Sequence, residues 1–218
     1  MAVMSDTRPN EHPSPARVLE NLLEGNRRFT TGLRLERDLP GEVLANAAGQ
    51  RPPAAIVGCI DSRATPELVF DLGIGEAFDI RLAGAIVDDI ALGSLEYACS
   101  AAGAVLVLVL GHTGCGAVKA ACDVASGDFP SEHGMSNLQA VIEPILEAVD
   151  AESEIVGNRS STNEAFVDRV AELNVHRTIM EIRGRSDLLD RMIEEGRVGI
   201  AGAMYDVRTG QIRVIDFP

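Results

Sequence analysis

Runs of apolar residues alternate with amphipathic stretches along most of the chain. Three runs have the length of strands, at 54–60, 77–82 and 104–111. The first and third are apolar throughout, as is typical of strands buried on both faces of a parallel sheet. Apolar positions at helical spacing predict helices between and after these strands, over 65–73, 89–102, 116–127, 134–150, 162–183 and 186–195.

Strands separated by helices predict right-handed βαβ crossovers. The chain closes on a predicted hairpin, in which VGIAGAMYDV (198–207) turns at 208–210 into QIRVIDF (211–217). We therefore expect an α/β fold with a central, mainly parallel β-sheet flanked by helices. The sheet should contain about four parallel strands and a C-terminal antiparallel strand.

The N-terminal part differs from the rest. Residues 1–13 are polar and proline-rich and predict a flexible tail, and 14–49 predict a helical arm. Ser14-Pro15 is a favourable helix start, and the apolar stripe that follows needs a cover, either a neighbouring subunit or a distant part of the same chain. A second short helix is expected over 39–49. Residues 50–218 then form the α/β domain, so that the chain is one domain overall.

Composition narrows the function classes. The 218 residues are 46% hydrophobic and carry a net charge of −14, which argues against a nucleic-acid partner because nothing would neutralise the phosphates. No signal peptide is visible, and the longest apolar run, 101–111, is about half as long as a membrane helix. We expect a cytoplasmic protein without a membrane partner, whose four cysteines are reduced thiols or metal ligands.

Reactive side chains follow the two most apolar strands. Cys59 ends the first and leads to Asp61 and Arg63, while the third is followed by His112 and Cys115. If these strands are neighbours, the side chains converge at the carboxyl edge of the sheet. Two thiolates and an imidazole suit tetrahedral Zn²⁺ and leave a fourth position open, as in catalytic sites. Alone, Cys59 could be an inert buried thiol and His-x-x-Cys a chance match, so the prediction depends on both motifs following strands.

The remaining cysteines and histidines are expected to be structural. Cys99 and Cys122 lie in predicted helices without a nearby histidine, which favours a packing role. His12, His133 and His176 fall in the tail, a loop and a helix, where surface or structural roles are expected.

Taken together, the motifs resemble the β-class carbonic anhydrases, whose zinc motif is Cys-x-Asp-x-Arg followed by His-x-x-Cys. The resemblance covers almost the whole chain, through segments in the family's order: EGNRRF (24–29), GQRPPAAIVGCIDSR (49–63), IALGSLEYA (90–98), GHTGCGAV (111–118) and AGAMYDVRTGQI (201–212). It implies reversible hydration of CO₂ to bicarbonate and a proton, with one Zn²⁺ per chain in a catalytic domain at 50–218.

The resemblance also implies roles for single residues. The implied zinc ligands are Cys59, His112 and Cys115, and Asp61 with Arg63 matches the catalytic Asp–Arg dyad. The implied substrate-binding positions, several of them often placed across a subunit interface, are Gln50, Phe78, Ala83, Tyr97 and Gly116.

Asp61 has two implied positions. Paired with Arg63, it would accept a hydrogen bond from the attacking hydroxide and orient it toward CO₂. Released from Arg63, it could swing onto zinc as a fourth ligand in a closed state. Because two thiolates leave the metal site formally neutral, we also expect activity to favour alkaline pH. A surface ion pair without function, worth only about 0 to 1 kcal/mol, is the plainer alternative.

Several positions depart from the family pattern. Members with a regulatory bicarbonate pocket carry Trp where this chain has Ile56, although Arg81 and Tyr205 could supply the other two pocket residues. Leu82 and Ala85 replace two polar residues near the pocket rim. Regulation by bicarbonate is therefore doubtful from the sequence.

Three other functions compete with CO₂ hydration. The same scaffold could hydrolyse carbonyl sulfide or carbon disulfide, which are isosteric with CO₂, or it could be a catalytically silent zinc-binding module. A nucleotide-binding α/β protein would need a phosphate loop, which GHTGCG does not make.

The family resemblance further implies a homodimer or homotetramer with exchanged N-terminal helices. We expect Ile60, between Cys59 and Asp61, to pack toward the core.

Overall fold

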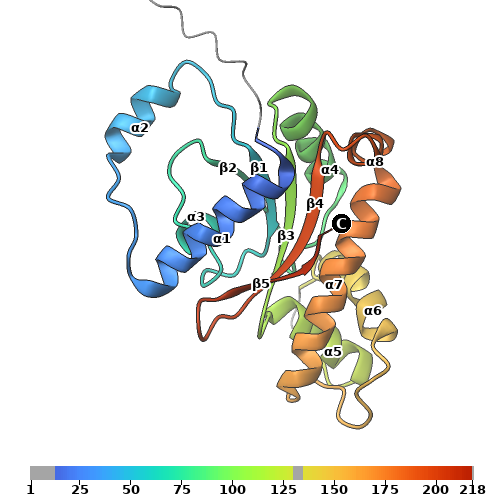
Figure 1. Cartoon of the computed structure of the whole chain (residues 1–218). Coiled ribbons are helices and arrows are strands. Elements are labelled where there is room, and N and C mark those ends of the chain that lie inside the picture. Colours follow the sequence, from blue (N-terminus) through green and yellow to red (C-terminus); the bar gives the residue numbers. More distant parts are fainter. Residues whose placement is uncertain (1–12, 130–134, 218) are drawn as a thin grey trace, which may run out of the picture.

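The computed structural model describes residues 13–129 and 135–217, so most of the predicted tail, with His12, and the loop position of His133 lie outside the described residues. Its centre is a five-stranded sheet of order β2-β1-β3-β4-β5 (Figure 1). The strands are β1 (Ala54–Gly58), β2 (Ala77–Arg81), β3 (Leu106–His112), β4 (Gly199–Tyr205) and β5 (Ile212–Asp216). The first four are parallel and β5 is antiparallel to β4, which confirms the predicted fold class.

The centre of the sheet is β1 paired with β3. Every residue of both strands is buried, because helices cover both faces, and this explains their continuous apolar sequences. Gly58 lies opposite Leu110 in the β1–β3 register. The residues that follow the two strands therefore emerge at the same edge of the sheet, as predicted.

One face of the sheet is covered by α1 (Pro15–Thr31) and the short α3 (Pro66–Val69). The apolar stripe of α1 packs against this face of its own chain, in one cluster with Ile56 and Leu108. At Gly25 the helix approaches so closely that a Cβ would lie 1.8 Å from the Phe70 carbonyl oxygen, so only glycine fits. By contrast, α2 (Leu39–Asn46) projects from the body and has no buried residue (Figure 1).

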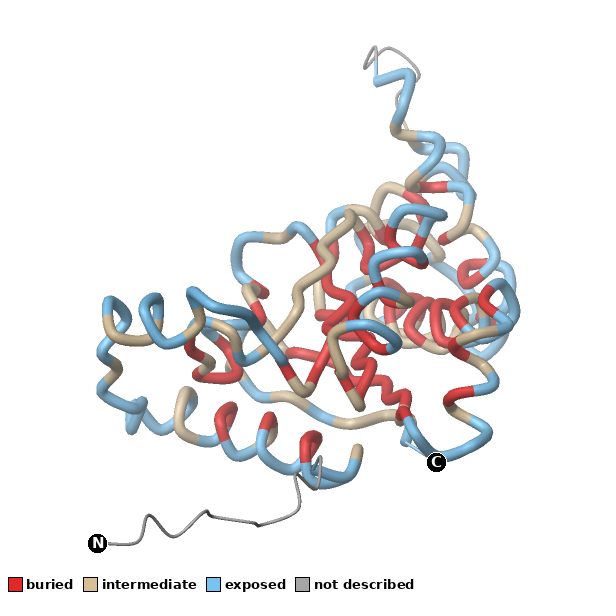
Figure 2. Tube along the Cα trace, turned by 90° about the horizontal axis from the view of Figure 1, so that it is seen from above, coloured by how far each residue is buried: buried red, intermediate tan, exposed pale blue. Residues whose placement is uncertain are grey.

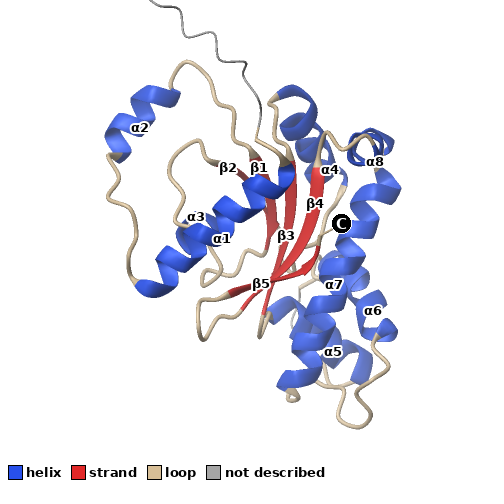
Figure 3. Ribbon diagram, viewed as in Figure 1, coloured by secondary structure: helices blue, strands red, loops and turns tan. Residues whose placement is uncertain are grey.

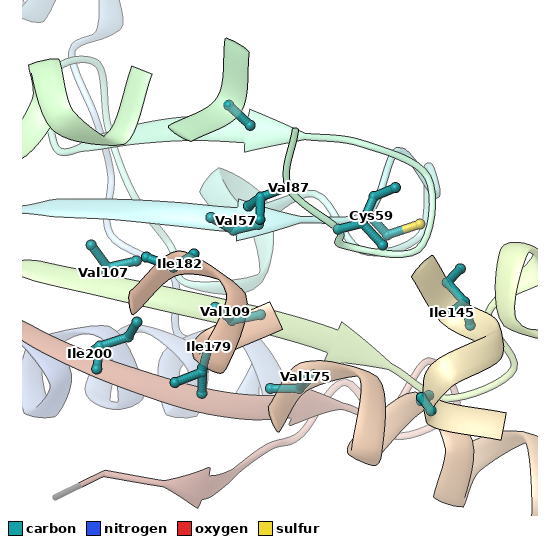
Figure 4. Close-up of a cluster of buried hydrophobic side chains, with 14 of the residues drawn as sticks. Val57, Cys59, Val87, Val107, Val109, Ile145, Val175, Ile179, Ile182 and Ile200 are labelled. Atoms are coloured by element: carbon teal, nitrogen blue, oxygen red, sulfur yellow. The ribbon is translucent and has the colours of Figure 1, made fainter. Parts of the chain in front are cut away.

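The other face is covered by α4 (Asp89–Glu96), α5 (Gly116–Ser126), α6 (Gln139–Ala151), α7 (Glu164–Arg185) and α8 (Asp187–Glu194) (Figure 3). Buried positions concentrate in the sheet and in the helix faces that contact it (Figure 2). Val175 and Ile179 of α7 lie over Val109 of β3 and Ile200 of β4 in the larger of two apolar clusters (Figure 4). Among the described residues, no helix is long and apolar enough to cross a membrane.

Two predicted helices differ from those observed. The helix expected over 65–73 ends at Val69, because Asp71 has a positive φ of 53° and turns its buried carboxylate to Arg28 and Arg34. The helix expected over 89–102 is split, and its last turn is the π-helical segment η1 (Tyr97–Ala101). The helix expected over 134–150 begins at Gln139, and its predicted first residue lies outside the described residues. The other helices begin and end within about three residues of the predicted positions.

Candidate metal centre and active site

The three predicted metal ligands come together at the carboxyl edge of the sheet. Cys59 directly follows β1, His112 is the last residue of β3, and Cys115 precedes the first residue of α5. All three side chains are buried, and their ligand atoms lie within 4.8 Å of one another. Within the described part of the chain, no other cluster of potential metal ligands occurs. In Figure 4, Cys59 stands just beyond the end of β1, with its sulfur directed away from the strand.

The His112 ring is oriented for metal binding. Its Nδ1 lies 3.0 Å from the Thr113 carbonyl oxygen. A carbonyl can only accept a hydrogen bond, so Nδ1 carries a proton, and in the neutral ring Nε2 carries the lone pair. Nε2 is buried and has no hydrogen-bond partner among the described residues. A lone pair left bare beside two thiols fits Zn²⁺, which takes sulfur and imidazole nitrogen as ligands.

The two thiols share one proton. Their sulfur atoms are 3.9 Å apart, and the hydrogen bond from the Cys115 thiol holds the pKa of Cys59 well below its usual range. The same bond raises the pKa of Cys115, because Cys115 is the donor in it. The Gly84 N–H, 3.3 Å from the Cys59 sulfur, also favours its thiolate. One soft anionic ligand is therefore present before any metal binds.

Asp61 forms an ion pair with Arg63 in this structure. Its two carboxylate oxygens accept hydrogen bonds from Nε and Nη2 of Arg63, at 2.9 and 2.7 Å, and the Arg63 N–H adds a third at 2.9 Å. These bonds lower the pKa of Asp61 to about 2. Its Oδ2 is 3.9 Å from Nε2 of His112. The ionised carboxylate is therefore bound to Arg63 and at the same time lies beside the metal site.

Arg81 holds the turn that carries the first ligand. Its guanidinium donates to the carbonyl oxygens of Cys59 and Asp61, both at 2.8 Å. It therefore supports the backbone of the site. Ile60, between these two carbonyls, is 61% exposed, so the prediction that it packs toward the core is wrong. It lies two residues beyond Gly58, the last residue of β1, outside the strand that is buried on both faces.

The predicted substrate-binding residues divide into two groups. Ala83 precedes Gly84, which contacts Cys59, and Gly116 follows Cys115, so both are beside the metal ligands.

The other three, Gln50, Phe78 and Tyr97, line a surface hollow of about 500 Å³ at the free edge of β2. Phe78 lies three residues before Arg81, about 10 Å back along the strand from the metal edge. A single chain does not bring this second group to its own metal centre, so their role in substrate binding stays a prediction.

The sequence did not indicate that α7 supports the site. Asn174, fully buried in this helix, donates from Nδ2 to the Gly84 carbonyl oxygen at 2.8 Å. Asp168, in the same helix, accepts a hydrogen bond from the Gly114 N–H at 2.8 Å. Asn174 interrupts an apolar helical stripe and could have been noticed as a polar residue in the core. Asp168 has no such signal, because acidic residues are common on exposed helix faces.

Comparisons with known proteins identify the family. The family model described as carbonic anhydrase matches residues 54–212. The chain belongs to the β-carbonic anhydrase family. It is 35% identical over 205 residues to carbonic anhydrase 2 of Mycobacterium tuberculosis, with 93% of each chain covered. It is 33% identical over 208 residues to the carbonic anhydrase of Mycolicibacterium smegmatis, covering 94% of this chain and 95% of that protein.

Solved structures show the same fold. The β-carbonic anhydrase of Coccomyxa, determined in complex with acetazolamide, superposes with a TM-score of 0.70 at 25% identity, covering 90% of this chain and 86% of that one. One of two tetrameric β-carbonic anhydrases from Sordaria macrospora gives a TM-score of 0.65 at 22% identity, covering 92% and 94%. These likenesses show that this chain has the fold of the β-carbonic anhydrases.

Proposed function

We propose that this carbonic anhydrase catalyses the zinc-dependent, reversible hydration of CO₂ to bicarbonate and a proton. The observation that carries the proposal is the bare Nε2 of His112 beside the sulfur atoms of Cys59 and Cys115. Zinc bound there would act as a Lewis acid and make a water molecule nucleophilic near neutral pH. Three protein ligands leave a position open for the chemistry, as catalytic zinc sites require.

The Asp61–Arg63 dyad supplies the orientation. Because its pKa is about 2, Asp61 is a carboxylate at neutral pH and can only accept hydrogen bonds. Arg63 occupies both carboxylate oxygens and fixes their direction. A nucleophile that donates a hydrogen bond to Asp61 must turn its lone pair away from the carboxylate, and this is the direction from which CO₂ would be attacked.

We further propose that the enzyme is a dimer, or a pair of dimers, joined along the free edge of β2. The strand lacks a neighbour on one side, and the hollow beside it exposes Ile90 and Tyr97. In such a dimer, Gln50, Phe78 and Tyr97 of one subunit would complete the substrate pocket of the other. The two β-carbonic anhydrases of Sordaria macrospora are tetrameric, which supports the proposal that this chain forms an oligomer.

The exchanged element in this dimer would be α2. The apolar stripe of α1 is already buried on its own sheet and needs no cover from a partner. In contrast, α2 exposes Leu39, Val43 and Leu44, and none of its residues is buried.

The cysteines of the described chain are all free thiols, which is consistent with the proposed location in the reducing cytosol.

Substitution of His112 tests the proposed function. We expect His112→Ala to lose both bound zinc and CO₂ hydration, while His176→Ala, whose ring contacts Asp216 away from the site, keeps both. Zinc per chain and the rate of CO₂ hydration are measured on the same samples. Retained hydration in His112→Ala would contradict the proposal. Wild-type protein that turns over carbonyl sulfide or carbon disulfide faster than CO₂ would favour the hydrolase alternative.

A further inference from the structure

The ligand loop between β3 and α5 is tied to a helix far along the chain. We propose that Asp168 of α7 is a positioning residue for the metal site, which holds the Gly114 peptide and thereby fixes Cys115 relative to His112. The proposal deepens the proposed function, because it rests on zinc binding by these two ligands.

Only two residues, Thr113 and Gly114, separate the two ligands. Thr113 is fixed to the turn after β4, since its N–H donates to the Tyr205 carbonyl at 3.0 Å and its Oγ1 accepts from the Val207 N–H at 3.1 Å. The N–H of Gly114 is held by Asp168 Oδ1 at 2.8 Å. Gly114 has a φ of +62°, a conformation that glycine adopts easily and leaves easily. The carboxylate therefore restrains the most pliable residue of the loop.

The same residue also reaches the catalytic dyad through its carbonyl group. The carbonyl oxygen of Gly114 lies 3.5 Å from Nη2 of Arg63, which also holds Asp61. Asp168 on the N–H side and Arg63 on the carbonyl side therefore contact residue 114 from opposite directions. Rotation of this residue would move the Cys115 sulfur and change the surroundings of the dyad together.

The support behind Asp168 is rigid. Its neighbours in α7, Phe166, Val167 and Val170, are fully buried in the core of the molecule. Asn174, further along the helix, holds the Gly84 carbonyl, and the Gly84 N–H contacts the Cys59 sulfur. One helix thus restrains the loops around both cysteine ligands. Residues that orient metal ligands from behind change metal affinity by about 10- to 100-fold when they are removed.

Zinc affinity of the full-length protein is the measurement that tests this role. Three variants are compared with wild type by competition with a chromophoric zinc chelator: Asp168→Ala, Asp168→Asn and Glu172→Ala. We expect Asp168→Ala to bind zinc about 10- to 100-fold more weakly, because it has no acceptor for the Gly114 N–H. Asp168→Asn keeps an acceptor oxygen and should stay within about threefold of wild type. Glu172→Ala removes a charge from the next turn of α7, where Glu172 contacts Arg169 and Arg213, and should not change zinc affinity.

Cobalt spectra and unfolding of the metal-free variants separate positioning from folding. We expect Asp168→Ala to alter the thiolate-to-Co²⁺ bands, while its metal-free unfolding temperature stays close to that of Glu172→Ala. Wild-type zinc affinity in Asp168→Ala, or an equal loss in Asp168→Asn, would overturn the positioning role. A lower unfolding temperature with unchanged affinity would do the same. Failure of the wild-type protein itself to bind zinc would instead refute the proposed function.

Discussion

His112 and Asp61 face each other across the site, and each is fixed by one neighbour. The Thr113 carbonyl selects the tautomer of His112 that presents Nε2, and Arg63 holds the carboxylate of Asp61 at 3.9 Å from that nitrogen. The lowered pKa of Asp61 means that this ion pair is present above its unfolded pKa of 3.8 and is lost only as the pH falls toward about 2. The dyad is therefore intact throughout the neutral range.

The dyad gives a prediction for a single isosteric substitution. Asp61→Asn should keep one zinc per chain, because Asp61 is not among the three clustered ligands, but should lower CO₂ hydration on the order of 100-fold. The amide also presents a donor to the site and binds Arg63 weakly. Steady-state hydration and metal content are measured together, with Asp89→Asn, an exposed carboxylate of α4, as the control. Full activity in Asp61→Asn would remove its assigned role.

Element by element, the sequence predicted well wherever burial was complete. The continuous apolar runs around Ile56 and Leu108 identified β1 and β3, because a strand covered on both faces is apolar along nearly all of its length. The positions of Cys59 and His112 then predicted the metal edge before the strand order was known.

What the sequence could not predict depends on distant contacts. The early end of α3 is caused by Asp71, whose partners Arg28 and Arg34 belong to the N-terminal arm. The support of the ligand loop by Asp168 joins residues 54 positions apart. Neither contact leaves a periodic pattern, since each depends on one side chain meeting one distant group.

The edge strand β2 contains a buried acid that gives a pH prediction. Both carboxylate oxygens of Asp79 are buried without a hydrogen-bond partner among the described residues. Burial, with a further contribution from the carboxyl of Glu67 in α3, raises the pKa of Asp79 to about 8, and the opposing charge of Arg81 does not cancel this. Folding therefore binds a proton between pH 3.8 and about 8, so the stability that neutral Asp79 provides is lost as the pH rises through this range.

Asp79→Asn should remove this pH dependence, because an amide does not ionise. The free energy of unfolding of Asp79→Asn, relative to wild type, should rise by more than about 1 kcal/mol between pH 5 and pH 8 and then level off. Urea unfolding at saturating zinc measures this free energy at each pH. Asp89→Asn is the control, because it removes a negative charge elsewhere. A difference from wild type that is the same at every pH would show that Asp79 is ionised in the folded protein.

Within one chain, the metal ligands and the dyad lie at one edge of the sheet. Gln50, Phe78 and Tyr97 instead line the hollow beside the free edge of β2. The proposed assembly along β2 would join these parts from two chains into one catalytic site. It also gives the exposed apolar residues of α2 and α4 a partner.

Two substitutions of similar exposure test the assembly. Ile90 is 80% exposed beside the hollow, and Met180 is 66% exposed on α7 and does not line the hollow. Ile90→Glu should convert the wild-type oligomer to monomers, keep one zinc per chain and lower hydration by about tenfold or more, because no partner completes the pocket. Met180→Glu should change neither mass nor activity. Light scattering measures the mass of each variant, and a hydration assay measures its activity. An active Ile90→Glu monomer would contradict a shared pocket.

We propose above all that the Cys59, His112 and Cys115 cluster holds the zinc that hydrates CO₂. The most direct test of this claim measures CO₂ hydration by stopped flow on one preparation as isolated, after removal of zinc by a chelator, and after stepwise return of zinc. We predict that hydration disappears on removal and returns in proportion to zinc, reaching its full rate at one zinc per chain. Hydration that persists without zinc, or protein with one zinc per chain that does not hydrate CO₂, would contradict the claim.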